Sequence, residues 1–183
     1  MKKAKVKSII DDLVGDLHRS PKLMPDAKYV ISDDEIILKL SNFNDVGARD
    51  HEGKTLLMYA VLYEREKIVE YLLKRNVDVN ASEKSDYTAL HFAAQAGNAG
   101  IVKMLLESGA NAKAKDSYGN IPLLRCSINT SFDAISVLLE YGSDPYEKNN
   151  YGVSAVDIWG TNHRFNDIMK YRAETACVNP NKT

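Results

Sequence analysis

The stretch from Asp50 to Asn149 repeats itself at a fixed step of 33 residues, and this repetition constrains the fold more than any other feature. The pair Leu72-Leu73 recurs as Leu105-Leu106 and Leu138-Leu139. Other residues that recur in register are Thr55 with Thr88, Ala60 with Ala93, Val69 with Val102 and Ile135, and Gly109 with Gly142. No insertion or deletion is needed over three copies. A period of this length indicates stacked units rather than a closed globule.

Within one unit, the pattern of apolar residues predicts two short helices. Leu57, Ala60 and Val61 give the first helix a narrow apolar side, and a second helix has a broader one built from Ile68, Val69, Leu72 and Leu73. Residues that tolerate positive φ follow the second helix at Asn76, Gly109 and Gly142, and stand in a later turn at Gly53, Asp86, Gly119 and Gly152. Each unit is therefore expected to run turn, helix, loop, helix and extended arm.

The repeats resemble the ankyrin repeat. The run Thr88-Ala89-Leu90-His91-Phe92-Ala93-Ala94 is similar to the family signature T-P-L-H-x-A-A, and Asp116-Ser117-Tyr118-Gly119 is similar to its D-x-x-G turn. Two departures are Glu64 in place of the glycine after the first helix, and Ile121-Pro122-Leu123-Leu124, which lacks the threonine and histidine. The resemblance spans about residues 44 to 171. It implies an all-α ankyrin-repeat solenoid of helix-loop-helix units with β-hairpin-like turns.

The repeats proper are expected at residues 50–171, as 50–82, 83–115, 116–148 and a truncated C-terminal cap, 149–171. In this last copy Trp159 replaces the small residue of the earlier copies and is expected to seal the array. Residues 172–183 are expected to fray.

An N-terminal cap is expected at residues 1–49, where an amphipathic helix over residues 2–18 covers the first repeat. A membrane-surface helix is disfavoured because acids share its polar face. Residues 19–32 read as a loop. Ser32 with Glu35 forms a capping-box pattern, which predicts a helix from about Asp33 with a buried side made of Ile36, Ile37, Leu38 and Leu40. A degenerate half-repeat at residues 44–48 follows.

Composition narrows the function classes. The chain has 183 residues and a formal net charge of -1, which disfavours a nucleic-acid binder. No apolar run reaches the roughly 18 residues needed to span a bilayer, and acids interrupt the first apolar segment, so we expect neither a membrane partner nor a secretory signal. Two cysteines, Cys126 and Cys177, suit a reducing compartment, and we expect a cytoplasmic protein that is monomeric when free.

No motif for catalysis, metal or cofactor binding stands out. His91 is expected to hydrogen-bond near Thr88, and Cys126 to be a packing residue in the slot of Ala60 and Ala93. The acids Asp50, Glu83 and Asp116 share one turn position and are expected to accept bonds from backbone amides. The sequence therefore predicts a protein that is not an enzyme and has no metal, cofactor or catalytic residue.

The family resemblance implies a concave binding surface formed by the turn tips and the outward side of each first helix. The candidate partner-binding residues in those slots are His51, Glu52, Lys54, Tyr63, Lys84, Tyr87, Gln95, Tyr118, Asn120, Asn129, Asn150 and Tyr151. Tyr118 and Tyr151 hold the same repeat position, and tyrosine is enriched at binding hot spots. The alternative is that the tyrosines merely stack on their own hairpins.

These features predict a non-enzymatic protein–protein interaction module that binds one folded protein. The segments 118–123, 138–145 and 148–154 also resemble small stand-alone bacterial ankyrin proteins, among which are immunity proteins that bind and neutralise a cognate toxin. That resemblance implies neutralisation of a toxin domain by occlusion. The alternative is a generic ankyrin adaptor or host-directed effector that binds another protein.

Overall fold

The computed structural model describes residues 12, 14–16, 31–43, 45–129, 131–160 and 165. These residues form helices and no strand, which confirms the all-α expectation. The named helices are α2 (Asp33–Ser41), α3 (Leu56–Leu62), α4 (Glu66–Lys74), α5 (Ala89–Ala96), α6 (Ala99–Glu107), α7 (Pro122–Asn129), α8 (Phe132–Glu140) and α9 (Ala155–Trp159).

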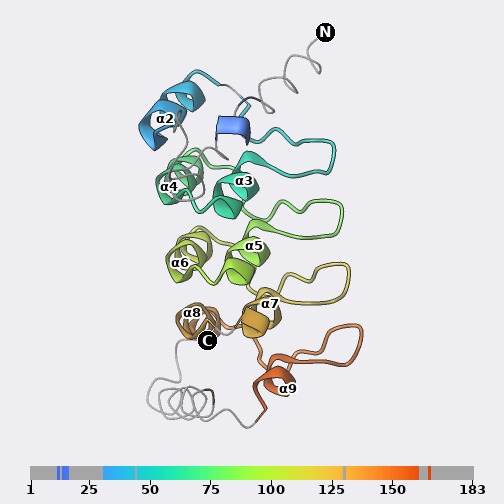
Figure 1. Ribbon diagram of the computed structural model, residues 1–183. Helices are drawn as coiled ribbons and strands as arrows, with labels where there is room; N and C mark the ends of the chain where they lie inside the picture. The colour runs from blue at the N-terminus through green and yellow to red at the C-terminus, as the bar shows by residue number, and fades with distance from the viewer. Residues whose placement is uncertain are drawn as a thin grey trace.

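The helices stack in two columns, as Figure 1 shows. The first helices of the units, α3, α5, α7 and α9, form one column, and α2, α4, α6 and α8 form the other. The bounds of α2 lie one 33-residue step before those of α4, so α2 is the second helix of a partial repeat that the sequence pattern shows only from residue 44. The array therefore extends further toward the N-terminus than its recognisable sequence repeats.

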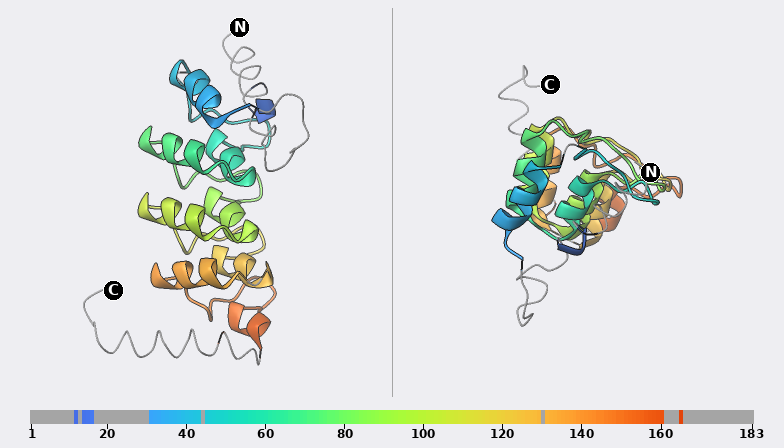
Figure 2. Two further views of the ribbon diagram at one scale, coloured as in Figure 1. Left: turned by 60° about the vertical axis from the view of Figure 1, so that its left-hand side comes forward. Right: turned by 90° about the horizontal axis from the view of Figure 1, so that it is seen from above.

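Four extended arms connect the columns, at residues 42–55, 75–88, 108–121 and 141–154. All four project to the same side of the helix stack (Figure 2). Isolated bridges pair Arg49 with Thr55 and Ser82 with Thr88 at the base of the first two hairpins. We call the surface shared by the arms and the first helices the concave face.

Burial of one leucine position in each helix holds the layers together. The first helices contribute Leu57, Leu90 and Leu123, and the second helices contribute Leu72, Leu105 and Leu138, all at most 1% exposed. Between neighbouring first helices the contact residues are Ala60, Ala93 and Cys126, each fully buried. Their small size permits the close approach of α3, α5 and α7, as the alanines of the sequence predicted.

The residues with positive φ lie at the turn positions that the sequence predicted. Asn76, Gly109 and Gly142 all have positive φ, and so do Gly53, Asp86, Gly119 and Gly152 at the arm tips. Glu64, which replaces a glycine of the family pattern, is held at φ 52°. Gly119 is further constrained by space, because an added Cβ would lie 2.9 Å from the backbone nitrogen of Asn150.

The helix predicted from Asp33 is α2, and it packs against α4. Ser32 Oγ accepts a bond from Glu35 N at 3.2 Å, which is one half of the predicted capping box. Ile36 and Leu40 are buried and Ile37 is half-buried, but the prediction for Leu38 is wrong, since 65% of it is exposed. Residues 36 and 40 lie one turn apart on the same face, and residue 38 points away from them.

Arg65 joins the N-terminal segment to the first complete repeat. Its side chain is 4% exposed, and its Nη1 lies 2.6 Å from Asp33 Oδ1. It also donates to the carbonyls of Ile31, at 3.2 and 3.3 Å, and of Asp16, at 3.1 Å. Asp16 in turn pairs with Lys39 at 2.7 Å. The described part of the predicted helix over 2–18 is therefore tied to the array, and its remaining residues lie outside the described chain.

The other end is closed by Trp159, which is 5% exposed in the slot of Ala60, Ala93 and Cys126. Its Nε1 donates to Ser127 Oγ at 3.0 Å, and its ring stacks on Phe165 with centroids 4.7 Å apart. The indole therefore takes the place of the small residues that space α3, α5 and α7, and it covers the last of these helices. The expected frayed tail, residues 172–183, lies outside the described residues.

Leu105→Ala should lower the free energy of unfolding by roughly 2–5 kcal/mol, because it opens a cavity in a fully buried layer. Denaturant titration of the full chain measures this loss. Lys103→Ala, an exposed change on the same helix, is the control and should alter stability little. Equal stability of the two variants would contradict burial of the repeated leucines as the main source of stability.

Arg65→Ala should lower the free energy of unfolding by about 1–3 kcal/mol, because it removes the buried guanidinium that donates to the carbonyls of Ile31 and Asp16 and pairs with Asp33. Lys67→Ala, which removes an exposed cation two residues further along, in α4, is the matched control. Thermal melts compare the two. A melting point unchanged by Arg65→Ala would mean that the N-terminal segment is not held by this residue.

Candidate functional site

A side-chain acceptor just before the tip of each arm fixes the turn that follows. Asp50 Oδ1 accepts bonds from the amides of residues 52 and 54, both at 2.8 Å. Glu83 Oε1 does the same for residues 85 and 87, at 2.9 and 3.3 Å. Asp116 Oδ1 serves residues 118 and 120 at 2.9 Å, and Asn149 serves the last arm. This confirms the role predicted for the three acids.

The arm tips are also bonded to each other from repeat to repeat. Each bond joins an amide of one tip to a carbonyl of the preceding tip, at Lys84 N to Glu52 O (2.9 Å), Ser117 N to Ser85 O (2.9 Å) and Asn150 N to Tyr118 O (3.0 Å). Four tips therefore form one continuous ladder. A surface held in this way loses little conformational freedom when it binds.

Beneath the arms, His91 connects the second repeat to the third. Its Nδ1 lies 3.2 Å from Thr88 N and 2.9 Å from Thr88 Oγ1, and its Nε2 lies 3.0 Å from Asn120 O. Because the Thr88 amide can only donate, the proton belongs on Nε2. The predicted structural role of His91 is confirmed. Burial lowers the pKa of His91, and the bond to the Asn120 carbonyl opposes this effect without cancelling it.

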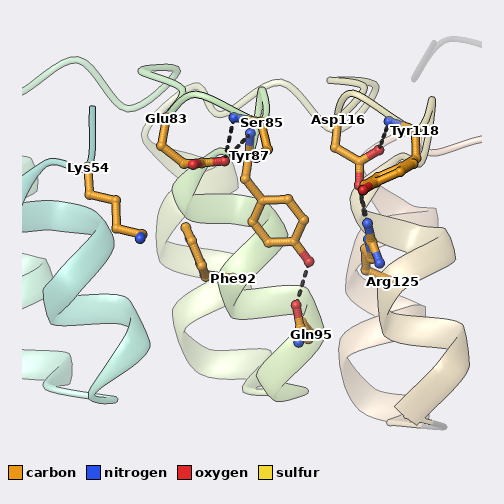
Figure 3. A pocket seen from close by; sticks show the side chains of 9 residues that line it. All are labelled: Lys54, Glu83, Ser85, Tyr87, Phe92, Gln95, Asp116, Tyr118 and Arg125. Carbon is orange, nitrogen blue, oxygen red and sulfur yellow. Dashed lines mark hydrogen bonds and ion pairs between the residues drawn. The ribbon is translucent and has the colours of Figure 1, made fainter. Parts of the chain in front are cut away.

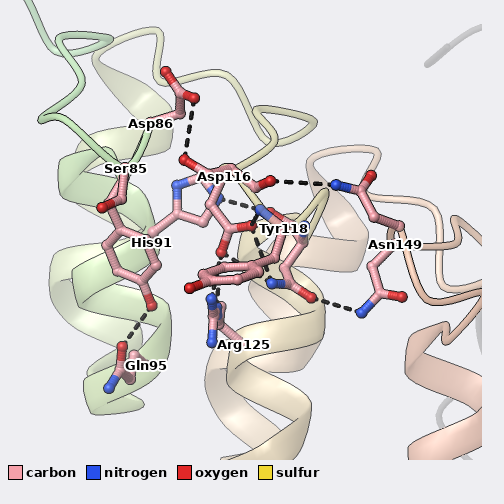
Figure 4. Close-up of polar contacts among 12 residues, drawn as sticks. Ser85, Asp86, His91, Gln95, Asp116, Tyr118, Arg125 and Asn149 are labelled. Atoms are coloured by element: carbon pink, nitrogen blue, oxygen red, sulfur yellow. Dashed lines mark hydrogen bonds and ion pairs between the residues drawn. The ribbon is translucent and has the colours of Figure 1, made fainter.

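One predicted contact residue, Asn120, is misplaced by the sequence pattern. It shares a slot with Lys54 and Tyr87, but it is only 8% exposed and does not face outward. Its Nδ2 donates to both oxygens of Asp116 at 3.0 Å, and its Oδ1 accepts from Asn149 at 2.8 Å. A short amide side chain reaches these inner partners, whereas a long lysine or tyrosine side chain does not. Figure 4 shows this polar network around Asp116.

The other candidate residues are exposed or partly exposed on the arms and first helices. They are His51, Glu52, Lys54, Tyr63, Lys84, Tyr87, Gln95, Tyr118, Asn129, Asn150 and Tyr151. Several are already bonded to neighbours at the surface. Glu52, for example, lies within 3.3 Å of both His51 and Lys84. Exposure alone therefore does not make each of them a contact residue.

The tyrosines fall into two classes. Tyr63 stacks on Tyr59 of its own unit, and Tyr87 packs edge-on against Phe92 with centroids 4.7 Å apart. Burial raises the pKa of Tyr87 to about 12. Tyr118 and Tyr151 are 53% and 72% exposed and stack on each other across two repeats, with centroids 6.5 Å apart. Stacking on their own units, which was the alternative to binding, thus describes Tyr63 and Tyr87. Tyr118 and Tyr151 stay exposed and open to a partner.

An open groove of about 340 Å³ lies on the concave face between the first and third repeats (Figure 3). Its lining residues are Lys54, Glu83, Ser85, Tyr87, Phe92, Gln95, Asp116, Tyr118 and Arg125. The sequence had selected Lys54, Tyr87, Gln95 and Tyr118, but it missed Phe92 and Arg125. One slot of the first helix holds Tyr59, Phe92, Arg125 and Ile158 in successive repeats. Including this slot in the 33-residue comparison would have added Phe92 and Arg125 to the candidates.

Arg125 is fixed at the wall of this groove. Its Nε lies 3.0 Å from Asp116 Oδ2, its Nη2 lies 2.5 Å from the same atom, and its guanidinium carbon lies 5.3 Å from the centre of the Tyr87 ring. Burial raises the pKa of Asp116, but hydrogen bonds from Asn120 and Arg125 outweigh burial and leave it below its usual value. The ion pair thus persists through the neutral range.

Features of a reaction centre are sparse in the described part of the chain. No three His, Cys, Asp or Glu side chains there are grouped so as to hold a metal ion. Cys126 is fully buried, and burial raises the pKa of its thiol to about 12, so the nucleophilic thiolate is disfavoured. None of the described helices has the length and apolar character to span a membrane.

Two protein-family models match the chain. One, described as ankyrin repeats in three copies, matches residues 27–83, and another, described as ankyrin repeats in many copies, matches residues 72–123. Together they span the helices from α2 to α6 and the arm that leads to α7. No curated protein matches the chain.

Stability should fall as the pH drops below about 6.5, the usual pKa of an unfolded histidine. In this window the unfolded chain binds a proton at residue 91 and the folded chain, whose His91 pKa is lowered, does not, so protonation favours unfolding. Denaturant titrations between pH 7 and about pH 5 measure the slope. His91→Gln should flatten it, and His51→Gln, at an exposed site, is the control. A slope that His91→Gln leaves unchanged would assign the effect to other groups.

Proposed function

The chain belongs to the ankyrin-repeat family, and from that premise we propose that it binds one folded protein across its concave face and inhibits it by occlusion. Ankyrin repeats form protein–protein interaction modules that are generally non-enzymatic. The concave face offers the contact area, and no bond chemistry is required of it. We infer a monomer in the free state.

The stacked pair Tyr118 and Tyr151 carries this proposal. Both rings are exposed, yet their backbones are fixed by the arm acceptors and by the bond from Asn150 N to Tyr118 O. An aromatic pair held in advance gives a partner a large contact area at small entropic cost. Exposed Ile128 and Val153 add apolar surface in neighbouring slots. Solvated apolar groups gathered in this way commonly mark a binding surface.

Toxin neutralisation is the specific form of inhibition that we propose. It is supported by the resemblance of the segments 118–123, 138–145 and 148–154 to small stand-alone bacterial ankyrin proteins, some of which are immunity proteins. A generic adaptor or host-directed effector would use the same face. The two differ in outcome, because an immunity protein abolishes the activity of its partner and an adaptor leaves it active. An activity assay of the captured partner, in a cytoplasmic extract, separates them.

Site-specific photo-crosslinking in the native cell would identify the partner. A photoreactive amino acid placed at Tyr151 or at Lys84 should capture the same protein, because both positions lie at arm tips. The same group at Lys103 or Glu107, on the exposed side of α6, should not capture it. Capture from α6 and not from the arms would place the binding site on the helical back.

Tyr118→Ala combined with Tyr151→Ala should weaken binding of the captured partner by at least about 2 kcal/mol, roughly thirtyfold. Calorimetry measures the loss, and the melting point should barely move because both rings lie outside the core. Tyr141→Ala with Tyr146→Ala removes two exposed tyrosines at and beyond the end of α8 and is the matched control. Normal binding by the Tyr118 and Tyr151 double variant would refute the proposed face.

A further inference from the structure

We propose that the groove on the concave face receives the carboxylate of an aspartate or glutamate side chain of the protein partner. The inference rests on the proposed function and specifies the chemistry of the partner at that same face. An apolar side chain next to the acidic one would contact the Tyr118 and Tyr151 pair, which adjoins the groove.

Two cationic groups border the groove with donors to spare. Lys54 extends toward Phe92 (Figure 3), and its ammonium group makes no hydrogen bond or ion pair with the described residues. Arg125 directs Nε and Nη2 to Asp116 Oδ2, and within the described chain its Nη1 donates to no acceptor. Lys54 and Arg125 come from different repeats and lie on opposite sides of Tyr87 and Phe92 (Figure 3), so each offers its donors to a separate acceptor, and we place the carboxylate at Lys54.

The acceptors of the groove, by contrast, are largely used. Asp116 has a side chain that is 1% exposed and takes bonds from the amides of residues 118 and 120, from Asn120 and from Arg125. Glu83 turns Oε1 to its own arm, and the Gln95 side-chain oxygen accepts from Tyr87. Gln95 is left with its amide donors. The groove therefore presents donors at Lys54, Arg125 and Gln95, and among its carboxylate oxygens only Glu83 Oε2 accepts no bond from the described residues. A carboxylate of the partner would supply the acceptor that these donors lack.

The charges lining the groove sum to zero, because Lys54 and Arg125 are matched by Glu83 and Asp116. Long-range attraction is therefore a minor contribution, and recognition depends on the local placement of donors. Tyr87 and Phe92 form an apolar floor that can cover the methylene groups of the acidic side chain. Charged hydrogen bonds are stronger beside such a floor than in open water.

Selection from a library of random linear peptides on the full-length chain provides the probe. The enriched peptides should carry an aspartate or glutamate beside an apolar residue. Replacing that acid by its amide in a synthetic peptide should weaken binding about tenfold, as expected for charged hydrogen bonds at a partly buried site. If no peptide is enriched, or if the enriched peptides lack an acid, the proposal is overturned.

A double-mutant cycle then assigns the effect to the groove. Lys54→Gln removes an ammonium that is bonded to no described residue, so folding should be unaffected, and the change from acid to amide in the peptide should cost less than about twofold in this variant. Lys67→Gln removes an exposed lysine on α4 and should keep the full tenfold effect. An undiminished effect in Lys54→Gln would place the carboxylate elsewhere.

The failures of the two proposals are distinguishable. Some peptides could bind the Tyr118→Ala and Tyr151→Ala double variant more weakly, yet bind the unchanged chain equally well with the acid or with its amide. That result would overturn the carboxylate subsite and leave the concave face intact. Peptides and captured partner that both bind this double variant normally would overturn the face itself, and the subsite with it.

Discussion

The structure depends on leucine burial between layers. A unit of two helices of seven to nine residues has one broad apolar side, and it can cover that side only with its neighbours. Leu72, Leu105 and Leu138 repeat the contact at each step, and Ala60, Ala93 and Cys126 set the spacing of the first helices. Both ends of such an array would expose the same surface. That is why Arg65 draws earlier residues onto the first complete repeat and why an indole, Trp159, fills the last small-residue slot.

The 33-residue periodicity correctly predicted the features that depend only on the position of a residue within its own repeat. The helices, the positive-φ turns and the buried leucines all follow from the 33-residue step, as does the family. The sequence failed where a side chain's partner lies in another repeat or outside the array. Arg65 resembles a surface residue until its bonds to residues 16, 31 and 33 are known. Asn120 occupies an outward slot, yet Asp116 and Asn149 draw it inward. Arg125 is a different case, because its partner Asp116 lies in the same repeat, and the 33-residue step places it in one slot with Tyr59, Phe92 and Ile158.

Rigidity of the arms has a polar origin that is distinct from the apolar core. The tip of each arm is held by a side-chain acceptor, at residue 50, 83, 116 or 149, and by a backbone bond to the neighbouring tip. Asp116 does more than its equivalents, because it also holds Arg125 and Asn120. The third repeat thus contributes both Arg125 at the wall of the groove and Tyr118, one of the two exposed stacked tyrosines. Asp116, a single buried carboxylate, bonds to the Tyr118 amide, to Asn120 and to Arg125 and so holds them near one another.

The side chains at the arm tips also change along the array, from charged residues at the N-terminal end to tyrosines at the C-terminal end. This change bears on how a partner would dock. The first tips carry Glu52 paired with Lys84 at 3.2 Å, with His51 beside Glu52, and these side chains remain solvated. Exposed ion pairs of this kind contribute little to affinity, but they disfavour partners with an apolar surface at that end. The last tips carry Tyr118 and Tyr151 with Val153 nearby. A partner would therefore gain most of its binding energy at the C-terminal half and its orientation at the N-terminal half, with the groove at Lys54 and Arg125 marking the boundary between the two.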